Sequence, residues 1–236
     1  MFTNSARFYD AIYEFKDYRA ESERVHELIQ ERNPGARSLL DVACGTGQHL
    51  EHLSEHYDVE GLDLDEELLA VARDRLPGTT LHSGDMIEFD LGKTFDAVTC
   101  LFSSIGYVRT EQNLEAAVAT MARHLSPHGV LVIEPWLTPD AWQDGHIGSV
   151  FVDHDDLKIA RLDTPQRDGH LSLIHFAYLV ATRDEISHFT EDHVLALCTD
   201  DQYRNALESA GLAIEHDPEG LMGRGLYIAT ASTRAE

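Results

Sequence analysis

The stretch LLDVACGTGQHLEHL, Leu39 to Leu53, joins two patterns that belong to different secondary structures. Its apolar start predicts a buried strand over 38–43, and the spacing after the glycines predicts a helix over 48–56. Between them lie Gly45 and Gly47, although glycine is a poor residue for strands and helices alike. In a parallel sheet, ligands bind beyond the carboxyl ends of the strands, where a glycine turn exposes backbone N–H groups. The stretch therefore predicts a cofactor loop.

Outward from this loop, strand and helix patterns alternate along the chain. Further strands are predicted over 59–63, 79–82, 95–101 and 129–134. Further helices are predicted over 65–76, with Asp65 as the N-cap, and over 111–125, where the segment SPHG at 126–129 turns the chain into the next strand. Such alternation predicts an α/β fold, a doubly wound and mainly parallel sheet with helices on both faces.

The pattern changes after Pro135. Short β-like stretches joined by polar turns such as QRDG predict an antiparallel insertion or lid, with strands over 149–154, 157–162, 171–181 and 193–199. A helix over 200–210, ended by Gly211, and strands over 213–217 and 225–231 follow. We therefore expect a single domain made of N-terminal helices (1–35), a cofactor-binding core (36–136), the lid (137–199) and a C-terminal helix and strands that complete the sheet (200–236).

Length and composition fit one large globular domain. The chain has 236 residues, of which 43% are apolar, and no apolar run is long enough to span a membrane. Arg7 and Asp10 interrupt the segment where a secretory signal would need apolar residues, which predicts a cytoplasmic, soluble protein. Three cysteines without a C-x-x-C spacing predict free thiols, and no metal site is expected.

The chain is strongly acidic. Its net charge of −24 arises from 42 acidic against 18 basic residues. Nucleic acid is excluded as a partner because phosphate binding relies on clustered Lys and Arg, and no such cluster occurs. Two interpretations of the acidity stay open: a highly solvated surface, or adaptation to high salt, where self-repulsion is screened.

Acidic residues follow successive strands. Asp63 closes one strand, and its carboxylate can accept both hydroxyl hydrogens of a ribose. Asp85 follows the next strand, where a carboxylate can accept an adenine amino hydrogen while the Met86 N–H serves a ring nitrogen. The dinucleotide motif G-x-G-x-x-G would require glycine at position 50, where the chain has Leu50, and the phosphate loop G-x-x-x-x-G-K-[ST] is absent. These features disfavour a nucleotide-dependent oxidoreductase.

With these motifs the chain resembles the class I methyltransferases that use S-adenosylmethionine. The matching features are LLDVACGTG, the acid Asp63, GDM (84–86) and FDAVTCLFSSIGY (95–107). More closely, the chain resembles the N,N-dimethyltransferases of nucleotide-linked amino sugars in macrolide biosynthesis, through KDYRAE, CGTGQHLEHL, FSSIGY, VIEPW and GRGLY. The resemblance implies a Rossmann-like seven-stranded sheet with an antiparallel insertion after the fifth strand, and S-adenosyl-L-methionine as the cofactor.

The resemblance also implies roles for particular residues. Tyr18 and Ala43 would hold the methionine end of the cofactor, Asp63 the ribose, and Asp85 with Met86 the adenine. The remaining cofactor-binding residues would be Asp41, Gly45, Gly47, Leu64 and Leu101.

On the acceptor side, Trp136, Arg161 and Arg224 would bind the substrate, with the indole stacking on a sugar ring and the guanidinium of Arg224 clamping an anionic group. Methyl transfer is a direct displacement, so alignment and desolvation supply most of the acceleration. Tyr107 and Glu134 are the candidate catalytic residues, which would keep the amine neutral or bind its ammonium form.

Two departures from the sugar-nucleotide pattern bear on the acceptor. Relatives that handle thymidine diphosphate sugars tend to carry a second tryptophan where this chain has Leu137, and a Ser/His-rich segment where it has LDTPQRDG with Asp163. We therefore expect N-methylation of an amino sugar, nucleotide-linked or not. Another small amine or hydroxyl acceptor, a non-catalytic S-adenosylmethionine-binding module and a homodimeric state stay open.

Two further sets of polar residues do not indicate a catalytic or metal site. His49, His52 and His56 could share one helix face, but without an H-E-x-x-H motif a solvated face is the better interpretation. The acidic run VDHDD (152–156) is interpreted as a lid turn.

Overall fold

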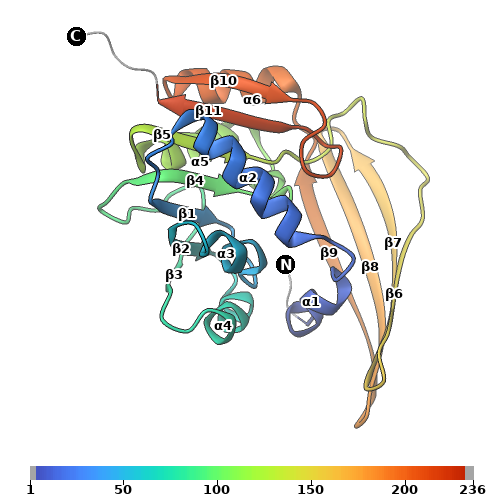
Figure 1. The fold of residues 1–236 in the computed structure, drawn as a ribbon. Helices are drawn as coiled ribbons and strands as arrows, with labels where there is room; N and C mark the ends of the chain where they lie inside the picture. Colours follow the sequence, from blue (N-terminus) through green and yellow to red (C-terminus); the bar gives the residue numbers. More distant parts are fainter. Residues whose placement is uncertain (1–3, 232–236) are drawn as a thin grey trace.

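The computed structural model describes residues 4–231, which form a large sheet with helices on both faces and a second sheet that stands beside it (Figure 1). The large sheet has the strand order β10-β11-β5-β4-β1-β2-β3, and all neighbours are parallel except β11, which is antiparallel to both β5 and β10. Its strands are β1 (Ser38–Val42), β2 (Asp58–Asp63), β3 (Thr80–Ser83), β4 (Phe95–Cys100), β5 (Leu125–Ile133), β10 (Leu212–Asp217) and β11 (Leu226–Ala231). The expected doubly wound, seven-stranded fold is confirmed.

Helices cover both faces because the central strands are apolar on both sides. Leu39 belongs to the core under α2 (Tyr18–Arg32), α3 (Gln48–Leu53) and α4 (Glu66–Arg75). Its neighbour Leu40 belongs to the core under α5 (Glu111–Arg123) and α6 (Asp200–Ser209). Successive strand residues point to opposite faces, so one apolar run builds both cores.

Side chains fix where the helices begin. Asp65 Oδ1 accepts hydrogen bonds from the N–H groups of Glu67 and Leu68, so the expected N-cap of α4 is confirmed. Thr199 and Gln202 form a capping box at the start of α6.

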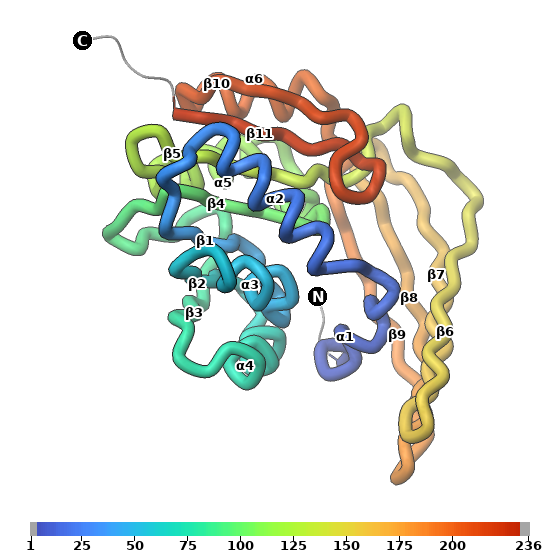
Figure 2. The backbone as a smooth tube through the Cα atoms, viewed as in Figure 1, coloured from blue at the N-terminus to red at the C-terminus, as the bar shows by residue number. Residues whose placement is uncertain are grey.

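The four-stranded sheet is the expected antiparallel insertion after β5, with the order β6 (Gly148–Asp153), β7 (Leu157–Asp168), β8 (Leu171–Thr182) and β9 (Ile186–Ala196). Alternate residues of β8 are buried. They pack with the N-terminal segment, the 3-10 turn η1 (Ala6–Phe8) and α1 (Tyr9–Ile12), through Phe8 and Ile12. Figure 2 shows this segment between the strands of the lid and the body of the large sheet.

Several predicted boundaries were wrong. The segment SPHG, expected as a turn before a strand over 129–134, lies inside β5, which already pairs with β4 at Leu125 and then shifts register before Val130. His128 has a φ of +67° in this irregularity. β7 continues through the expected QRDG turn to Asp168, and β9 begins at Ile186, earlier than expected, because the long strand β8 gives both a partner along their length.

Some expectations concern more than the described residues. The predicted division into four segments stays a prediction, and its first three and last five residues lie outside the part that the structure describes. Within residues 4–231, no helix has both the length and the apolar character needed to cross a membrane.

Candidate functional site

The glycine loop after β1 turns the chain with a run of left-handed backbone conformations. Ala43, Gly45 and Gly47 have φ values of +60°, +56° and +78°. Glycine adopts this region without the penalty that a Cβ brings. At Gly47, the N-cap of α3, a Cβ would also lie 3.2 Å from Leu76 Cδ1, so space as well as conformation favours glycine there.

Asp63 ties the loop to the end of β2. Its Oδ2 accepts a hydrogen bond from the Gly45 N–H at 2.7 Å, and its Oδ1 accepts one from the Asp65 N–H at 2.8 Å. Burial raises the pKa of the carboxyl, while the backbone N–H groups of Asp65 and Gly45 act in the opposite direction. The carboxyl is thus fixed in place at the carboxyl end of the sheet.

A cavity of about 420 Å³ opens at this end of the sheet. Its walls include the loop, the end of β2 and the segment after β3, where Asp85 Oδ1 accepts a hydrogen bond from the Ile87 N–H at 3.0 Å. The predicted cofactor residues that line it are Ala43, Gly45, Asp63, Leu64, Asp85 and Met86.

A small recess adjoins this cavity, and Ala43 and Gly45 line both hollows. Tyr18, Asp41 and Leu101, all predicted to contact the cofactor, line it. Asp41 accepts a hydrogen bond from Thr99 Oγ1 at 2.7 Å, and burial raises its pKa to about 7. Of the predicted cofactor residues, Gly47 alone lines neither hollow, because it serves the turn into α3.

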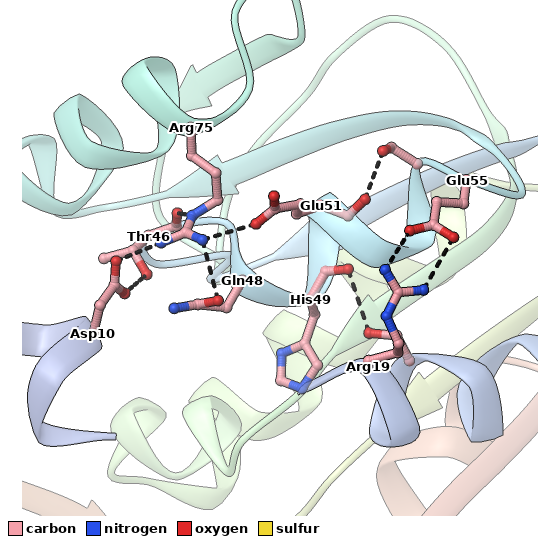
Figure 3. Close-up of polar contacts among 10 residues, drawn as sticks. Asp10, Arg19, Thr46, Gln48, His49, Glu51, Glu55 and Arg75 are labelled. Carbon is pink, nitrogen blue, oxygen red and sulfur yellow. Dashed lines mark hydrogen bonds and ion pairs between the residues drawn. The ribbon is translucent and has the colours of Figure 1, made fainter. Parts of the chain in front are cut away.

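The N-terminal segment is fastened to the loop by charges far apart in the sequence (Figure 3). Asp10 of α1 accepts a hydrogen bond from Thr46 Oγ1 at 2.7 Å and pairs with Arg75 at the end of α4. Arg75 also donates to the Thr46 carbonyl at 2.9 Å and pairs with Glu51. The sequence interpretation missed this link, because no local pattern connects position 10 with position 75.

The prediction of a solvated face was wrong for His49. Its side chain is buried, and its Nε2 lies 2.8 Å from Glu21 of α2, which also pairs with Lys16. The reason is that α2 packs across α3 and covers this part of its surface. Among the described residues, no three His, Cys, Asp or Glu side chains are placed to hold a metal ion.

A second cavity, of about 480 Å³, lies between the large sheet and the lid. All three predicted substrate residues line it. Arg224 donates to Ser103 Oγ at 2.9 Å, and its guanidinium carbon lies 4.7 Å from the centroid of the Trp136 ring. Arg161, which lies 4.8 Å from the Phe176 ring centroid, donates to the hydroxyl of Tyr13 at 3.1 Å.

The cavities of about 420 and 480 Å³ meet at a common wall. Tyr9, Ser104 and Tyr107 line both of them. Burial raises the pKa of the Tyr107 hydroxyl well above its usual value, so this group stays protonated at neutral pH. A molecule in the first cavity and one in the second would therefore face each other across neutral, mostly aromatic side chains.

Glu134, the second predicted catalytic residue, lies apart from this wall. It is fully buried beyond the end of β5, and its Oε2 accepts a hydrogen bond from the Phe102 N–H at 2.7 Å. It lines neither the first nor the second cavity. Burial raises the pKa of this carboxyl, whereas the charges of Lys16 and Arg224 lower it.

Sequence reasoning missed several residues of the second cavity. Tyr9 and Tyr13 come from the N-terminal segment, Phe102 and Ser103 from the turn after β4, and His193 from β9. The aromatic run YDAIYEF was a signal that could have indicated the first two.

Comparison with known proteins agrees with this geometry. A family model described as a methyltransferase domain matches residues 39–129. A Streptomyces venezuelae dTDP-3-amino-3,4,6-trideoxy-α-D-glucopyranose N,N-dimethyltransferase is 43% identical, over 94% of this chain and 96% of its own length. A Streptomyces fradiae dTDP-3-amino-3,6-dideoxy-α-D-glucopyranose N,N-dimethyltransferase is 41% identical, over 98% and 92%.

Solved structures agree as well. The crystal structure of Streptomyces venezuelae DesVI superposes with a TM-score of 0.93 and 41% identity, covering 98% of this chain and 99% of that one. The sugar N-methyltransferase KedS8 from Streptoalloteichus gives 0.89 and 43%, covering 94% and 92%. With such identity over nearly the whole chain, this protein belongs to the class I S-adenosylmethionine-dependent methyltransferases, in the family of nucleotide-linked amino-sugar N,N-dimethyltransferases.

Proposed function

We propose that this enzyme dimethylates the amino group of a dTDP-linked amino sugar. One observation carries the proposal: a cavity lined by Asp63 and Asp85 meets, at Tyr107, a second cavity lined by two arginines. The relatives that are more than 40% identical along most of the chain carry the names of such dimethyltransferases, which supports the same acceptor class.

The cofactor residues fit an adenosine with an amino acid attached. Asp63 would accept hydrogen bonds from the ribose hydroxyls, and Asp85 with the Met86 N–H would read the adenine edge. The recess at Tyr18, Asp41 and Leu101 would take the methionine end. S-adenosylmethionine supplies a methyl group already activated by its sulfonium charge, so positioning the neutral amine and excluding water supply most of the acceleration.

The second cavity, which we call the acceptor cavity, carries positive charge in an otherwise acidic protein. Arg161 and Arg224 both line it, and each guanidinium lies against an aromatic ring, which fixes its direction. A diphosphate is the group that two such guanidiniums bind well. Asp163, whose position suggested a different acceptor, lines the same cavity, and its carboxylate packs against the backbone of Gly148, where a Cβ would collide with it. It would oppose the phosphates less than a carboxylate pointing freely into the cavity.

At the common wall, Tyr107 would contact the amine. Its neutral hydroxyl can accept a hydrogen bond from an ammonium N–H, which holds the nitrogen towards the cofactor cavity. Glu134 lines neither the first nor the second cavity, so its part in catalysis stays a prediction; it would act through Phe102 and the turn that carries Ser103 and Ser104.

The outer face of the lid would form a homodimer interface. Phe151, Leu162 and Leu179 are 70%, 49% and 52% exposed, and they lie on neighbouring antiparallel strands of that face. An apolar area of this kind on a folded domain marks an interaction site. Light scattering should give the mass of a dimer for the native chain, and a monomer for Phe151→Asp. A native monomer would contradict the proposal.

Two other expectations stay proposals. A cytoplasmic location suits an enzyme whose described cysteines, Cys44, Cys100 and Cys198, are all free thiols. Adaptation to high salt rests on the charge of −24 alone. It predicts that the free energy of unfolding increases when molar KCl is added.

An acceptor screen tests the function. The enzyme would be incubated with S-adenosylmethionine and with dTDP-3-amino-3,6-dideoxyglucose, the same sugar without dTDP, and the corresponding 3-hydroxy sugar nucleotide. Mass spectrometry should find two successive methyl additions on the first compound and none on the third. Methylation confined to the hydroxyl compound would overturn the nitrogen assignment. Equal rates with the amino sugar that lacks dTDP would overturn the proposal that the acceptor is nucleotide-linked.

A further inference from the structure

Behind Tyr107 lies a row of polar side chains that connects the acceptor cavity with the N-terminal segment. The Tyr107 hydroxyl is 2.5 Å from Nδ1 of His193 on β9. On the other side of the imidazole, Nε2 lies 3.8 Å from Oε2 of Glu191, two residues earlier on the same face of the strand. The order of the groups is hydroxyl, imidazole, carboxylate.

The far end of the row is built to remain charged. Glu191 is 7% exposed and accepts hydrogen bonds from the N–H groups of Asn4 and Ser5, at 2.7 and 3.0 Å, and from Ser5 Oγ at 2.5 Å. Burial by itself would raise the pKa of this carboxyl, but the nearby imidazole of His193 and the hydrogen bonds from Ser5 and Asn4 outweigh it and lower the pKa to about 2.

The middle of the row is shielded from water on its sides. His193 is 3% exposed, and its ring packs edge-on against Phe176 of β8, with the centroids 5.0 Å apart. The other titratable or charged groups around the row come from the N-terminal segment, the turn after η2 (Ser104–Val108), β7 and β8; they are Tyr9, Tyr13, Arg109, Arg161 and Tyr178. Within the part of the chain that the structure describes, Glu191 is the carboxylate that faces the imidazole.

We propose that Tyr107, His193 and Glu191 form a proton relay that removes the proton of the acceptor ammonium before each methyl transfer. The inference rests on the proposed function, because it requires an amine at the common wall. An amine is mostly protonated at neutral pH and has no lone pair in that form, so it cannot attack. Alignment alone does not remove this proton.

The step balances as a double transfer. The ammonium N–H bond breaks, its electrons remain on nitrogen as the lone pair, and the proton bonds to the Tyr107 oxygen. The original hydroxyl proton of Tyr107 moves to Nδ1 of His193, which becomes an imidazolium beside the Glu191 carboxylate. Tyr107 is neutral before and after, as its raised pKa requires. His193 lines the acceptor cavity and returns its proton to water when the cavity opens, once per methyl group.

His193 is therefore a positioning and proton-accepting residue that acts through Tyr107. The alternative is that the imidazole only holds the Tyr107 ring in place and fastens the lid to η2. The two differ in their pH dependence. A proton acceptor becomes unnecessary at high pH, where the free amine enters from solution, whereas a mechanical support is needed at every pH.

The test compares His193→Asn with His188→Asn, an outward-facing residue of the same strand. Asparagine keeps an oxygen near the position of Nδ1 that can accept the Tyr107 hydrogen bond, but it takes no proton. With dTDP-3-amino-3,6-dideoxyglucose as acceptor, we expect kcat of His193→Asn to be reduced about tenfold or more at pH 7 and to approach the native value by about pH 9.5. The Kd for S-adenosylmethionine and the activity of His188→Asn should not change.

Tyr107→Phe should show the same rescue at high pH, and combining it with His193→Asn should reduce kcat no further, because both remove one pathway. A defect of His193→Asn that is equal at all pH values would overturn the relay while leaving the dimethyltransferase function intact.

A second measurement needs no acceptor, so it tests the relay even if the proposed function fails. Nitrogen NMR of the resting enzyme should show that Nδ1 of His193 accepts the hydrogen bond from the Tyr107 hydroxyl and that the ring proton lies on Nε2. A proton on Nδ1 would make Tyr107 the acceptor of that hydrogen bond and would refute the relay.

Discussion

Replacing Asp63 should weaken cofactor binding through two separable effects. The carboxylate accepts hydrogen bonds from the Gly45 and Asp65 N–H groups, and in the proposed complex it also accepts the ribose hydroxyls. Hydrogen bonds to a charged group contribute about 1.5–3 kcal/mol each before water compensates. Asp63→Asn retains one acceptor oxygen, turns the other into a donor and removes the charge.

The expected loss of affinity follows from this count. If one ribose hydrogen bond is lost and the other weakened, binding of S-adenosylmethionine becomes less favourable by about 1.5–3 kcal/mol, which is an increase in Kd of about 10- to 160-fold. Calorimetry measures this change directly. Asp58→Asn, an exposed residue at the opposite end of β2, is the matched control and should leave Kd unchanged.

A double-mutant cycle separates the ribose from the loop. Native enzyme should bind 2′-deoxy-S-adenosylhomocysteine more weakly than S-adenosylhomocysteine, whereas Asp63→Asn should lose most of this discrimination, because its hydroxyl contact is already impaired. Equal discrimination by both proteins, or an unchanged Kd for S-adenosylmethionine, would refute a role at the ribose and leave Asp63 as a support of the glycine loop.

Three further predictions concern the loop, the acceptor and the core. Asp10→Ala should increase the calorimetric Kd for S-adenosylmethionine by about two- to fivefold, because the partly exposed ion pair of Asp10 with Arg75 orders the glycine loop. Arg19→Ala breaks the exposed ion pair with Glu55 and should leave this Kd unchanged. Equal effects of the two substitutions would contradict a role of Asp10 in ordering the loop. The KM for a dTDP-sugar should increase between about 0.05 and 0.5 M NaCl, because the two arginines of the second cavity outweigh the net charge of the protein. The dependence of KM on salt should become shallower in Arg224→Met. A KM that decreases with salt in the native enzyme would show that the net charge dominates. The folded pKa of Asp41, about 7, exceeds its unfolded value, so this carboxyl binds more protons in the folded state, and its contribution to the free energy of unfolding is present at pH 3.5 and lost as the pH rises to 8. Denaturant titrations at pH 8 should therefore show Asp41→Asn to be more stable than the native chain, by about 4 kcal/mol at most. A stability difference between the two proteins that is the same at pH 5 and pH 8 would contradict the raised pKa.

The sequence by itself determined the order of strands and helices and the edge of the sheet where the cofactor cavity lies. These features depend on local causes: the apolar period of each segment, the cap at Asp65, and glycines that permit the turn at Gly45. Asp63 and Asp85 follow parallel strands, and the carboxyl ends of parallel strands meet at one edge. Their common cavity was therefore predictable without coordinates.

Only the tertiary structure decided which distant side chains meet. Whether a helix face is solvated depends on what packs over it. α2 buries His49, although no feature of the neighbouring sequence indicates that this side chain is covered. Asp10 pairs with Arg75, and Tyr107 contacts His193, which is 86 positions further along the chain, because packed elements hold both partners of each contact in place. Hydrophobic burial is non-directional and follows from composition and period, whereas a hydrogen bond forms only where the fold holds two particular atoms at about 3 Å.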